Sequence, residues 1–390
     1  MLIVDILAIL VLIAGLAIGI ARGLVATAGT IVGLVIGVVA AVWVVPLIAP
    51  GVADWQYRSL VLTVAALAVV ALGVALGAGV GLALRRGVEK SKLGVLDRIL
   101  GGVVDTAVAG FVLLLVAGAV TASGTPILSP AIASSRVIGT LDAFTPAPVD
   151  AALAELRGFV IDEGIPRVEE LLAPQVEPTA PPVSLDDPEL QEAAASVARI
   201  SGTAYACGLS VTGSGFVAAE DLIVTNAHVV AGVDTPVVEL PGRQAREGRV
   251  VYFDPVDDLA VIAVDDLGAT PLPIAEPVSA GTPVAVQGYP LGGPFTSGAA
   301  YVLSVGTAPV PDIYDSSSAP RAVYALEALV RPGNSGGPLL TEDGAVTGVV
   351  FARGEDDETR GYAMTTDELD PVLAGVASSD AAVGSGRCSN

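Results

Sequence analysis

Residues 328–340 read ALVRPGNSGGPLL, a segment that places Ser335 between glycines on both sides. Glycine adopts backbone conformations that other residues rarely adopt, so the segment predicts a tight turn. Such a turn presents Ser335 either as a nucleophile, with amide N–H groups directed at one point, or as an ordinary polar turn residue. The motif alone does not separate these interpretations. A nucleophile also needs a base and an orienting acid elsewhere in the chain.

His228, in the segment TNAHVV, is the only histidine among the 390 residues. A lone histidine is often a core or surface residue, but its unperturbed pKa range suits proton exchange near neutral pH. Asp258, in DPVDDLAVIAV, follows His228 by 30 positions, and Ser335 follows Asp258 by 77. The order His, Asp, Ser is that of the chymotrypsin-type triad, in which serine attacks, histidine takes its proton and aspartate orients the imidazole. The sequence therefore predicts these three roles.

The residues around these three positions have the pattern of a β protein. Short runs such as VVYFD, LAVIAV and PVAVQGYP are separated by Gly, Pro and Asp, which is typical of a barrel or sandwich. Thr365 and Glu368 are expected to form a capping pair that opens a terminal helix, TTDELDPVLAGVA. We expect residues 196–390 to be long enough for two small barrels.

Residues 1–123 have a different composition. The whole chain is 53% hydrophobic and only 15% charged, whereas about 25% of the residues of an average soluble domain are charged. Four apolar stretches are long enough to cross a bilayer, which takes about 20 residues. They are residues 2–21, 24–49, 59–84 and 99–123. A cleaved signal peptide is the alternative for the first stretch, but its apolar run is too long and a second stretch follows directly.

Basic residues beside these stretches predict the orientation, because cytoplasmic loops carry an excess of Lys and Arg. The residues expected on the cytoplasmic side are Arg22, Arg85, Arg86, Lys90, Lys92 and Arg98. Only Arg58 is expected on the other side. We therefore expect the N-terminus and everything after residue 123 to lie on the extracytoplasmic (periplasmic) side.

Glycine recurs at every fourth residue in three of the four stretches. The ladders are Gly15, Gly19 and Gly23; Gly29, Gly33 and Gly37; and Gly73, Gly77 and Gly81. Small residues at this spacing let helix backbones approach closely in lipid, which predicts a tightly packed bundle or helix–helix association. Glycine is also common in membrane helices, so one ladder alone is weak evidence. Asp105 in the fourth stretch marks either an ion path or a solvated position at the boundary.

Residues 124–195 contain ten prolines and clusters of acidic residues, which predicts a partly helical linker. We expect it to hold residues 196–390 away from the membrane. From residue 124 onward 36 Asp and Glu residues outnumber 12 Arg residues, a net charge of −24. This charge argues against a nucleic-acid partner, which would need a basic face.

Cys207 and Cys388 are the only cysteines, and both fall in the part expected outside the cytoplasm. We predict a disulfide that fixes the C-terminal tail, with two free thiols as the alternative. We also hypothesise that this bond orders the active site, so that activity depends on oxidation. One histidine and two distant cysteines offer no ligand cluster, so we expect no metal and no cofactor.

The segments SGFV, TNAHVV, DDLAVI and PGNSGGPL together resemble the trypsin-like serine proteases of the HtrA branch. Residues 1–123 resemble the colicin V production (CvpA) membrane domain, and the combination is similar to actinobacterial membrane-anchored serine proteases associated with acid resistance. The resemblance implies a four-helix transmembrane bundle, the linker, and an all-β chymotrypsin-like double barrel with a C-terminal helix. It also implies His228 as base, Asp258 as acid, Ser335 as nucleophile, and an oxyanion hole at Gly333 and Ser335.

Other site residues follow from the same resemblance. Asp257 competes with Asp258, but the family places its acid directly before Leu-Ala-Val, which favours Asp258. The substrate pocket is expected to have Leu329 at its floor, although Leu329 equally fits a core position. Its wall is expected from Val349, Val350 and Phe351, which suggests an apolar specificity. HtrA relatives usually carry a PDZ module after the protease, but only 55 residues follow Ser335 here. The residue before Ser335 is Asn334 rather than Asp, so activation by a freed N-terminus is not expected.

These features predict a membrane-anchored serine endopeptidase that cleaves cell-envelope or secreted proteins, with a role in acid or stress resistance. Its expected partners are a protein or peptide substrate and the lipid bilayer. The alternative is a catalytically silent protease-fold module that binds or senses, attached to a membrane bundle. Acid should protonate a general base and disable it. A role in acid therefore requires either a tuned base or a reorganised domain.

Overall fold

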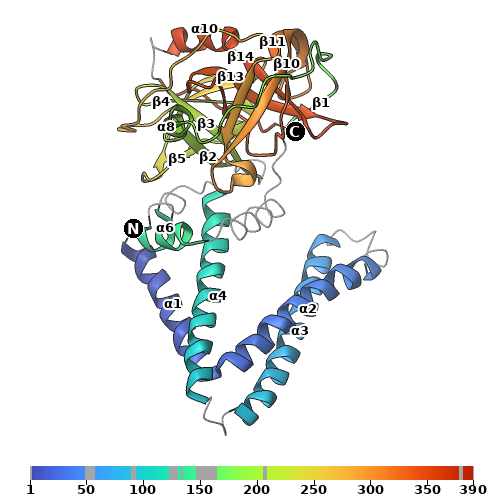
Figure 1. Ribbon diagram of the computed structural model, residues 1–390, viewed down its shortest axis with the longest axis vertical. Coiled ribbons are helices and arrows are strands. Elements are labelled where there is room, and N and C mark those ends of the chain that lie inside the picture. Colours follow the sequence, from blue (N-terminus) through green and yellow to red (C-terminus); the bar gives the residue numbers. More distant parts are fainter. Residues whose placement is uncertain are drawn as a thin grey trace. The chain divides into compact units, whose positions relative to one another are not determined.

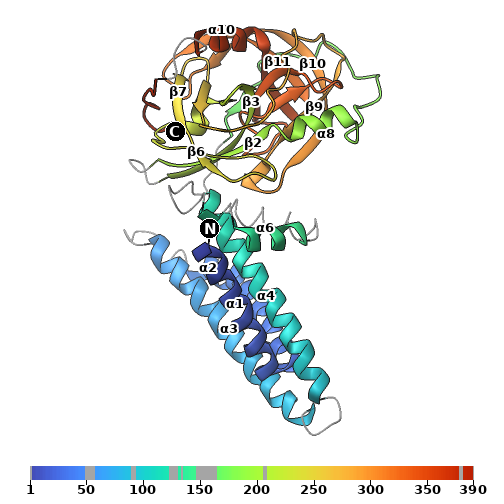
Figure 2. The ribbon, with the colours of Figure 1, turned by 90° about the vertical axis from the view of Figure 1, so that its left-hand side faces the viewer.

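The computed structural model of the chain describes residues 2–48, 58–88, 94–122, 131–132, 135–145, 165–204, 209–376 and 381–389. The chain divides into two compact units. One is helical and comprises Asp5–Leu113, and the other comprises Met1–Val4 and Leu114–Asn390 and contains the strands (Figure 1, Figure 2).

Within its described residues, the helical unit contains four helices: α1 (Leu2–Arg22), α2 (Leu24–Ile48), α3 (Arg58–Val88) and α4 (Gly94–Ala122). Two of them, α1 and α4, are long and apolar enough to cross a membrane, over Ile3–Arg22 and Gly94–Gly118. The described parts of α2 and α3 contain shorter apolar segments, Leu24–Gly37 and Ala71–Arg85. Large aliphatic side chains point outward from all four helices. Two of the four predicted spans are thus found as long apolar helices.

The glycine ladders lie where these helices touch. A β-carbon on Gly19 of α1 would collide with the backbone oxygen of Gly101 in α4, and one on Gly33 of α2 with that of Gly73 in α3. Because only hydrogen fits at these positions, the paired backbones can approach to contact. The close packing expected from the ladders is confirmed within this chain.

Gly77→Ala should destabilise the α2–α3 contact, because a β-carbon at Gly77 would collide with the backbone oxygen of Gly29. Gly79→Ala is the matched control, since a β-carbon at Gly79 meets nothing within 4 Å. Alanine favours the helix by roughly 0.5–1 kcal/mol at both sites, so the difference between the variants isolates the contact. Thermal unfolding of the full chain in detergent should show a lower midpoint for Gly77→Ala only. Equal midpoints for the two variants would contradict packing through this ladder.

The first sheet of the second unit contains seven strands in the order β6-β5-β2-β3-β4-β8-β7. The strands are β2 (Val197–Ala204), β3 (Leu209–Ala219), β4 (Leu222–Thr225), β5 (Val237–Glu239), β6 (Arg246–Glu247), β7 (Arg249–Asp254) and β8 (Leu259–Ala263). The short helix α9 (Ala227–Val230) follows β4. Every residue of β8 is buried, because its sequence LAVIA has no polar residue to alternate with.

The second sheet has the order β1-β13-β12-β9-β10-β11-β14, and β13 also pairs with β14. Its strands are β1 (Arg167–Val168), β9 (Pro283–Gly288), β10 (Thr296–Pro311), β11 (Ser318–Glu327), β12 (Pro338–Leu340), β13 (Val346–Gly354) and β14 (Arg360–Thr365). The extra pairing closes β9 to β14 into a barrel. Among the described residues, the pairings of the first sheet show no such closure. One core cluster joins both sheets, with Phe216 and Val261 from the first, and Phe351 and Tyr362 from the second.

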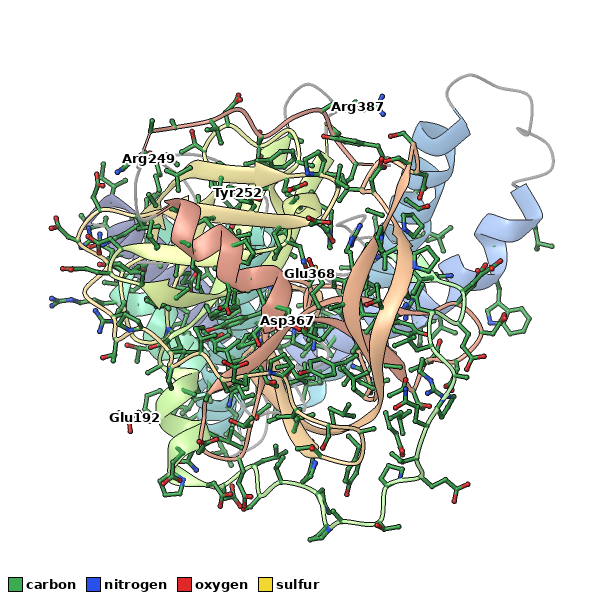
Figure 3. All side chains as sticks on the ribbon, turned by 90° about the horizontal axis from the view of Figure 1, so that it is seen from above. Glu192, Arg249, Tyr252, Asp367, Glu368 and Arg387 are labelled. Carbon is green, nitrogen blue, oxygen red and sulfur yellow. The ribbon has the colours of Figure 1, made fainter. Side chains whose placement is uncertain are left out.

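The predicted terminal helix is present as α10 (Thr366–Val376), which lies across one end of the β unit (Figure 1, Figure 2). The expected capping pair is wrong. The Thr365 hydroxyl is buried without a hydrogen-bond partner among the described residues. Glu368, on the first turn of α10 (Figure 3), accepts a 2.6 Å hydrogen bond from the Ala322 N–H of β11 instead. A contact between distant segments has replaced the local one.

Part of the predicted linker packs against the sheets. The helix α8 (Pro188–Ala194) buries Leu190, and the backbone oxygen of Leu190 accepts a 2.8 Å hydrogen bond from Gln287 of β9. Tyr301 of β10 donates a 3.0 Å bond to the backbone oxygen of Ala180. The segment 165–195 is therefore fastened to the β unit, whereas residues 146–164 lie outside the described residues. Upstream, α6 (Arg136–Ala143) begins after Ser135, whose hydroxyl caps it.

Candidate active site

His228 and Asp258 form a buried pair. His228 lies on α9, and its Nδ1 is 2.8 Å from Asp258 Oδ2 and 3.0 Å from Asp258 Oδ1. The backbone N–H of His228 also donates to Asp258 Oδ1, at 2.9 Å. Asn226, which precedes α9, donates from its side chain to the Asp258 backbone oxygen at 2.9 Å. The His228 N–H thus fixes the carboxylate and the Asn226 side chain fixes the Asp258 backbone, so that Nδ1 faces the carboxylate and Nε2 is the nitrogen available for proton transfer.

The turn before β8 determines which aspartate meets His228. Asp254 accepts hydrogen bonds from the backbone N–H groups of Val256 (2.8 Å) and Asp257 (3.1 Å), an Asx-type turn. Asp258 follows in the left-handed region, with φ of 55°, a conformation that non-glycine residues adopt only where the surroundings enforce it. Asp257 points away, with 38% of its side chain exposed. The carboxylate at His228 belongs to Asp258.

The Ser335 turn is tied to both sheets. The Ser214 hydroxyl of β3 donates to the Gly333 backbone oxygen at 2.7 Å and accepts from the Tyr289 N–H at 2.9 Å. The Ser214 N–H donates to the Ser335 backbone oxygen at 2.8 Å. Gly333 has φ of 91°, and a β-carbon there would collide with the Tyr289 backbone oxygen. Only glycine therefore fits at Gly333 without strain.

This turn lies beside the histidine segment, since a β-carbon built on Gly336 would be 3.0 Å from the backbone nitrogen of Asn226. Within the described part of the chain, Ser335 Oγ and His228 Nε2 are both buried and neither has a hydrogen-bond partner. The structure therefore joins histidine to aspartate but does not bond serine to histidine. The N–H groups of Gly333 and Ser335 also donate to no other described backbone or side-chain group. They remain available to an oxyanion.

A pocket of about 310 Å³ adjoins the His228–Asp258 pair. Its lining includes His228, Asp258, Phe351 of β13 and Arg321 of β11. Asp312, at the end of β10, also lines it. Hydrogen bonds from the hydroxyl groups of Ser316 and Ser317, both 2.6 Å, hold the pKa of Asp312 well below its usual range. The pocket therefore carries the negative charge of Asp312 and the positive charge of the buried Arg321.

The predicted pocket residues have different environments. Phe351 lines the pocket, whereas Val349 and Val350 are fully buried. Leu329 is 57% exposed, so the alternative that it fills the core is wrong. Its position at a substrate-pocket floor stays a prediction.

Sequence analysis did not identify Arg321, which is only 1% exposed. Its Nη2 donates to the backbone oxygens of Val256 (2.5 Å) and Pro311 (2.6 Å), and its guanidinium lies over the Phe351 ring at 5.8 Å. Burial lowers the pKa of Arg321 from its usual value. Arg321 connects the Asp258 turn of the first sheet with the second sheet, which makes it a positioning residue.

Arg321→Met should destabilise the protein by about 3 kcal/mol, because two buried backbone oxygens lose a charged donor. Arg249→Met is the matched control. Arg249 pairs with Asp265 at the surface, with 40% of its side chain exposed, and such pairs contribute about 0–1 kcal/mol. Chemical unfolding of the full chain in detergent, followed by circular dichroism, measures both free energies. A loss for Arg321→Met no larger than the control's would contradict the positioning role.

The C-terminal tail packs on the first sheet. The Gly232 N–H donates to the Ser385 backbone oxygen at 3.0 Å, and the Val383 N–H to that of Val250 at 2.8 Å. Cys388 belongs to this tail, but Cys207 lies outside the described residues, so their pairing stays a prediction. The described part of the chain contains no group of three or more His, Cys, Asp or Glu side chains that could hold a metal.

Comparison with known proteins gives matches to both parts of the chain. A family model described as a trypsin-like peptidase domain matches residues 213–349, and one described as colicin V production protein matches residues 4–146. Serine protease Rv3671c of Mycobacterium tuberculosis is 32% identical over 314 residues, which covers 79% of this chain and 79% of that protein. A DegP-like probable periplasmic serine endoprotease of Hahella chejuensis is 35% identical over 145 residues, covering 35% of this chain and 29% of that protein.

The crystal structure of the Rv3671c protease in its active form is also similar, at 34% identity and a TM-score of 0.51. It covers 56% of this chain and 100% of the crystallised one. The trypsin-like match, residues 213–349, includes His228, Asp258 and Ser335. The chain belongs to the family of serine protease Rv3671c, the trypsin-like serine proteases that carry a colicin V production domain.

Proposed function

We propose that this protein is a membrane-anchored endopeptidase that cleaves cell-envelope or secreted proteins outside the cytoplasm. The buried His228–Asp258 pair carries the proposal, because it lies beside a serine turn whose Gly333 and Ser335 N–H groups donate to no other described group. Ser335 Oγ would attack the scissile carbonyl carbon while His228 Nε2 takes the hydroxyl proton. The N–H groups of Gly333 and Ser335 would stabilise the oxyanion, and His228 would then give its proton to the leaving amine. Water would release the acyl group by the same steps.

The membrane part of the proposal has its own support. The matching family model, the two long apolar helices and the outward-facing aliphatic side chains of all four helices support four spans in a bilayer. The excess of basic residues between the helices supports an extracytoplasmic β unit. The acidic net charge of the exterior part supports a protein substrate rather than a nucleic acid. A role in acid or stress resistance rests only on the family resemblance.

The endopeptidase proposal is tested by incubating the purified full chain with an unfolded protein and sequencing the new N-termini by mass spectrometry. Wild type should generate internal cleavages that the Ser335→Ala variant does not. Internal cleavage by both proteins would reveal a contaminating protease, and cleavage by neither would contradict the proposal.

A catalytically silent binding module is the second candidate function. It is favoured by one observation, the buried Ser335 Oγ that has no hydrogen bond to His228 among the described residues. Catalytic hydrogen bonds are often long before substrate binds, so the observation fits an enzyme at rest as well. A folded wild type that never reacts with a serine-directed reagent would favour the silent module.

We propose a disulfide between Cys207 and Cys388, supported by the docking of the C-terminal tail on the first sheet. By the chain-entropy argument it stabilises the unit by about 4 to 5 kcal/mol. Cys207→Ser should lower both the unfolding midpoint and the proteolytic rate, and a reductant should do the same to wild type. Proteolysis that is unchanged in Cys207→Ser would contradict control of the active site by this bond.

A further inference from the structure

The short strand β1 occupies an edge of the second sheet that would otherwise be open. Arg167 and Val168 pair in parallel with Arg353 and Gly354 of β13. The N–H groups of Arg353 and Glu355 donate to the backbone oxygens of Pro166 (3.1 Å) and Val168 (3.0 Å). Such an edge binds extended polypeptide by adding a strand, and backbone hydrogen bonds give the affinity. Here the added strand comes from the segment that joins the helical unit to the sheets.

The side chains of this segment are anchored by burial. Ile165 is 5% exposed and belongs to a cluster with Val330 and Val350, whereas Arg167 faces outward. Both cluster partners belong to segments that adjoin the serine turn. Val330 precedes Ser335 by five positions, and the Val350 backbone oxygen accepts the Gly336 N–H at 2.8 Å. Ile165 thus belongs to a cluster that includes Val350, which is hydrogen-bonded to the serine turn.

The same segment lines the pocket next to the catalytic pair. Residues 165–168 form part of the lining together with His228, Asp258 and Phe351. Ser335 is only 2% exposed, and both Ser335 Oγ and His228 Nε2 are shielded from solvent. A scissile peptide must contact both atoms. Some of the residues that cover these atoms must therefore move before a substrate can bind.

We infer that residues 165–168 are an intramolecular ligand of the substrate groove, and that they restrain the protease until they are displaced. The inference rests on the proposed endopeptidase function and specifies its substrates. They are extended polypeptides that pair with the β13 edge and place a large aliphatic side chain where Ile165 lies. A tethered ligand acts at an effective concentration of about millimolar, so even a weak segment competes with substrate in solution.

The test uses the full chain in detergent and compares Ile165→Asp with Ala173→Asp. Both variants place the same acid on the same segment, but Ile165 is buried within residues 165–168, whereas Ala173 is exposed and lies outside them. The rate of Ser335 labelling by a fluorophosphonate and kcat/KM for a short peptide are measured for each. Ile165→Asp should raise both by roughly tenfold or more, and Ala173→Asp should leave them within about twofold. A synthetic peptide of residues 163–170, EGIPRVEE, should inhibit Ile165→Asp competitively, and the same peptide carrying Ile165→Asp should not.

The outcomes separate this inference from the proposed function. Equal labelling rates in wild type and Ile165→Asp would overturn the inference and leave the protease intact. Slower labelling in Ile165→Asp would overturn it too, because the segment would then complete the site rather than fill it. Absence of labelling from all forms would contradict the proposed function. In that case, amide hydrogen exchange at Arg353 and Glu355 still tests whether residues 165–168 pair with β13. Exchange that Ile165→Asp does not accelerate would overturn the inference. If Ile165→Asp does not unfold cooperatively, Ile165→Ala takes its place, with an expected rise of about threefold.

Discussion

Asp258→Asn should lower kcat about 10⁴-fold while KM and the fold change little. The Asp258 carboxylate accepts the Nδ1 proton of His228, and this bond leaves Nε2 unprotonated and ready to receive the serine proton. An asparagine amide can donate to Nδ1 instead, which favours the tautomer that carries its proton on Nε2. The measurement is steady-state hydrolysis of a fluorescence-quenched peptide by the full chain.

Asp257→Asn is the matched control for Asp258→Asn. The Asp257 side chain is 38% exposed, and its nearest charged partner is Arg321, at 3.9 Å from Nε. The kcat of Asp257→Asn should stay within about threefold of wild type, since Asp257 does not lie on the path of the proton. A larger loss for Asp257→Asn than for Asp258→Asn would reverse the assignment of the acid.

Ser335→Ala and His228→Ala should each lower kcat by about 10⁶-fold, and the double variant should lose little more. The two groups act in one step, because the attack of Ser335 Oγ requires His228 Nε2 to take its proton. Ser279→Ala, an exposed serine outside the site, should retain full activity. Losses that multiply in the double variant would show that serine and histidine act independently, contrary to the triad.

The three candidate triad residues stand out in the sequence because they lie in short segments with local signals. Ser335 lies in a glycine-rich turn, and the residue at His228 is the only histidine of the chain. Asp258 could be preferred to Asp257 only through the family resemblance. The structure supplies the physical reason, an Asx-type turn at Asp254 that rotates Asp258 into the left-handed region.

Contacts between distant segments could not be predicted. In the sequence, Arg321 is one charged residue in a segment that favours β structure. Its guanidinium nevertheless donates to the backbone oxygen of Val256, which is 65 positions away in the sequence. Ser214 lies within SGFV, but its bond to Gly333 spans 119 positions. The Thr365 and Glu368 capping pair failed for the same reason, because Ala322 of β11 supplies a better placed N–H. Local motifs give way where tertiary packing offers another partner.

The linker shows a related limit. Prolines and acidic residues in 124–195 predict a partly helical linker, and composition gives no sign that Ile165 or Leu190 is buried against the sheets. One aliphatic residue every few positions is too sparse to produce a strand or helix periodicity. The pairing of β1 with β13 therefore emerges only from the assembled sheet.

Covalent labelling of Ser335 in the full chain by a fluorophosphonate tests the triad most directly. Intact mass should show one adduct on wild type, and peptide sequencing should place it on Ser335. Ser335→Ala should show no adduct, and His228→Ala should react slower by orders of magnitude. An adduct elsewhere, or none on folded wild type and on folded Ile165→Asp, would contradict the account.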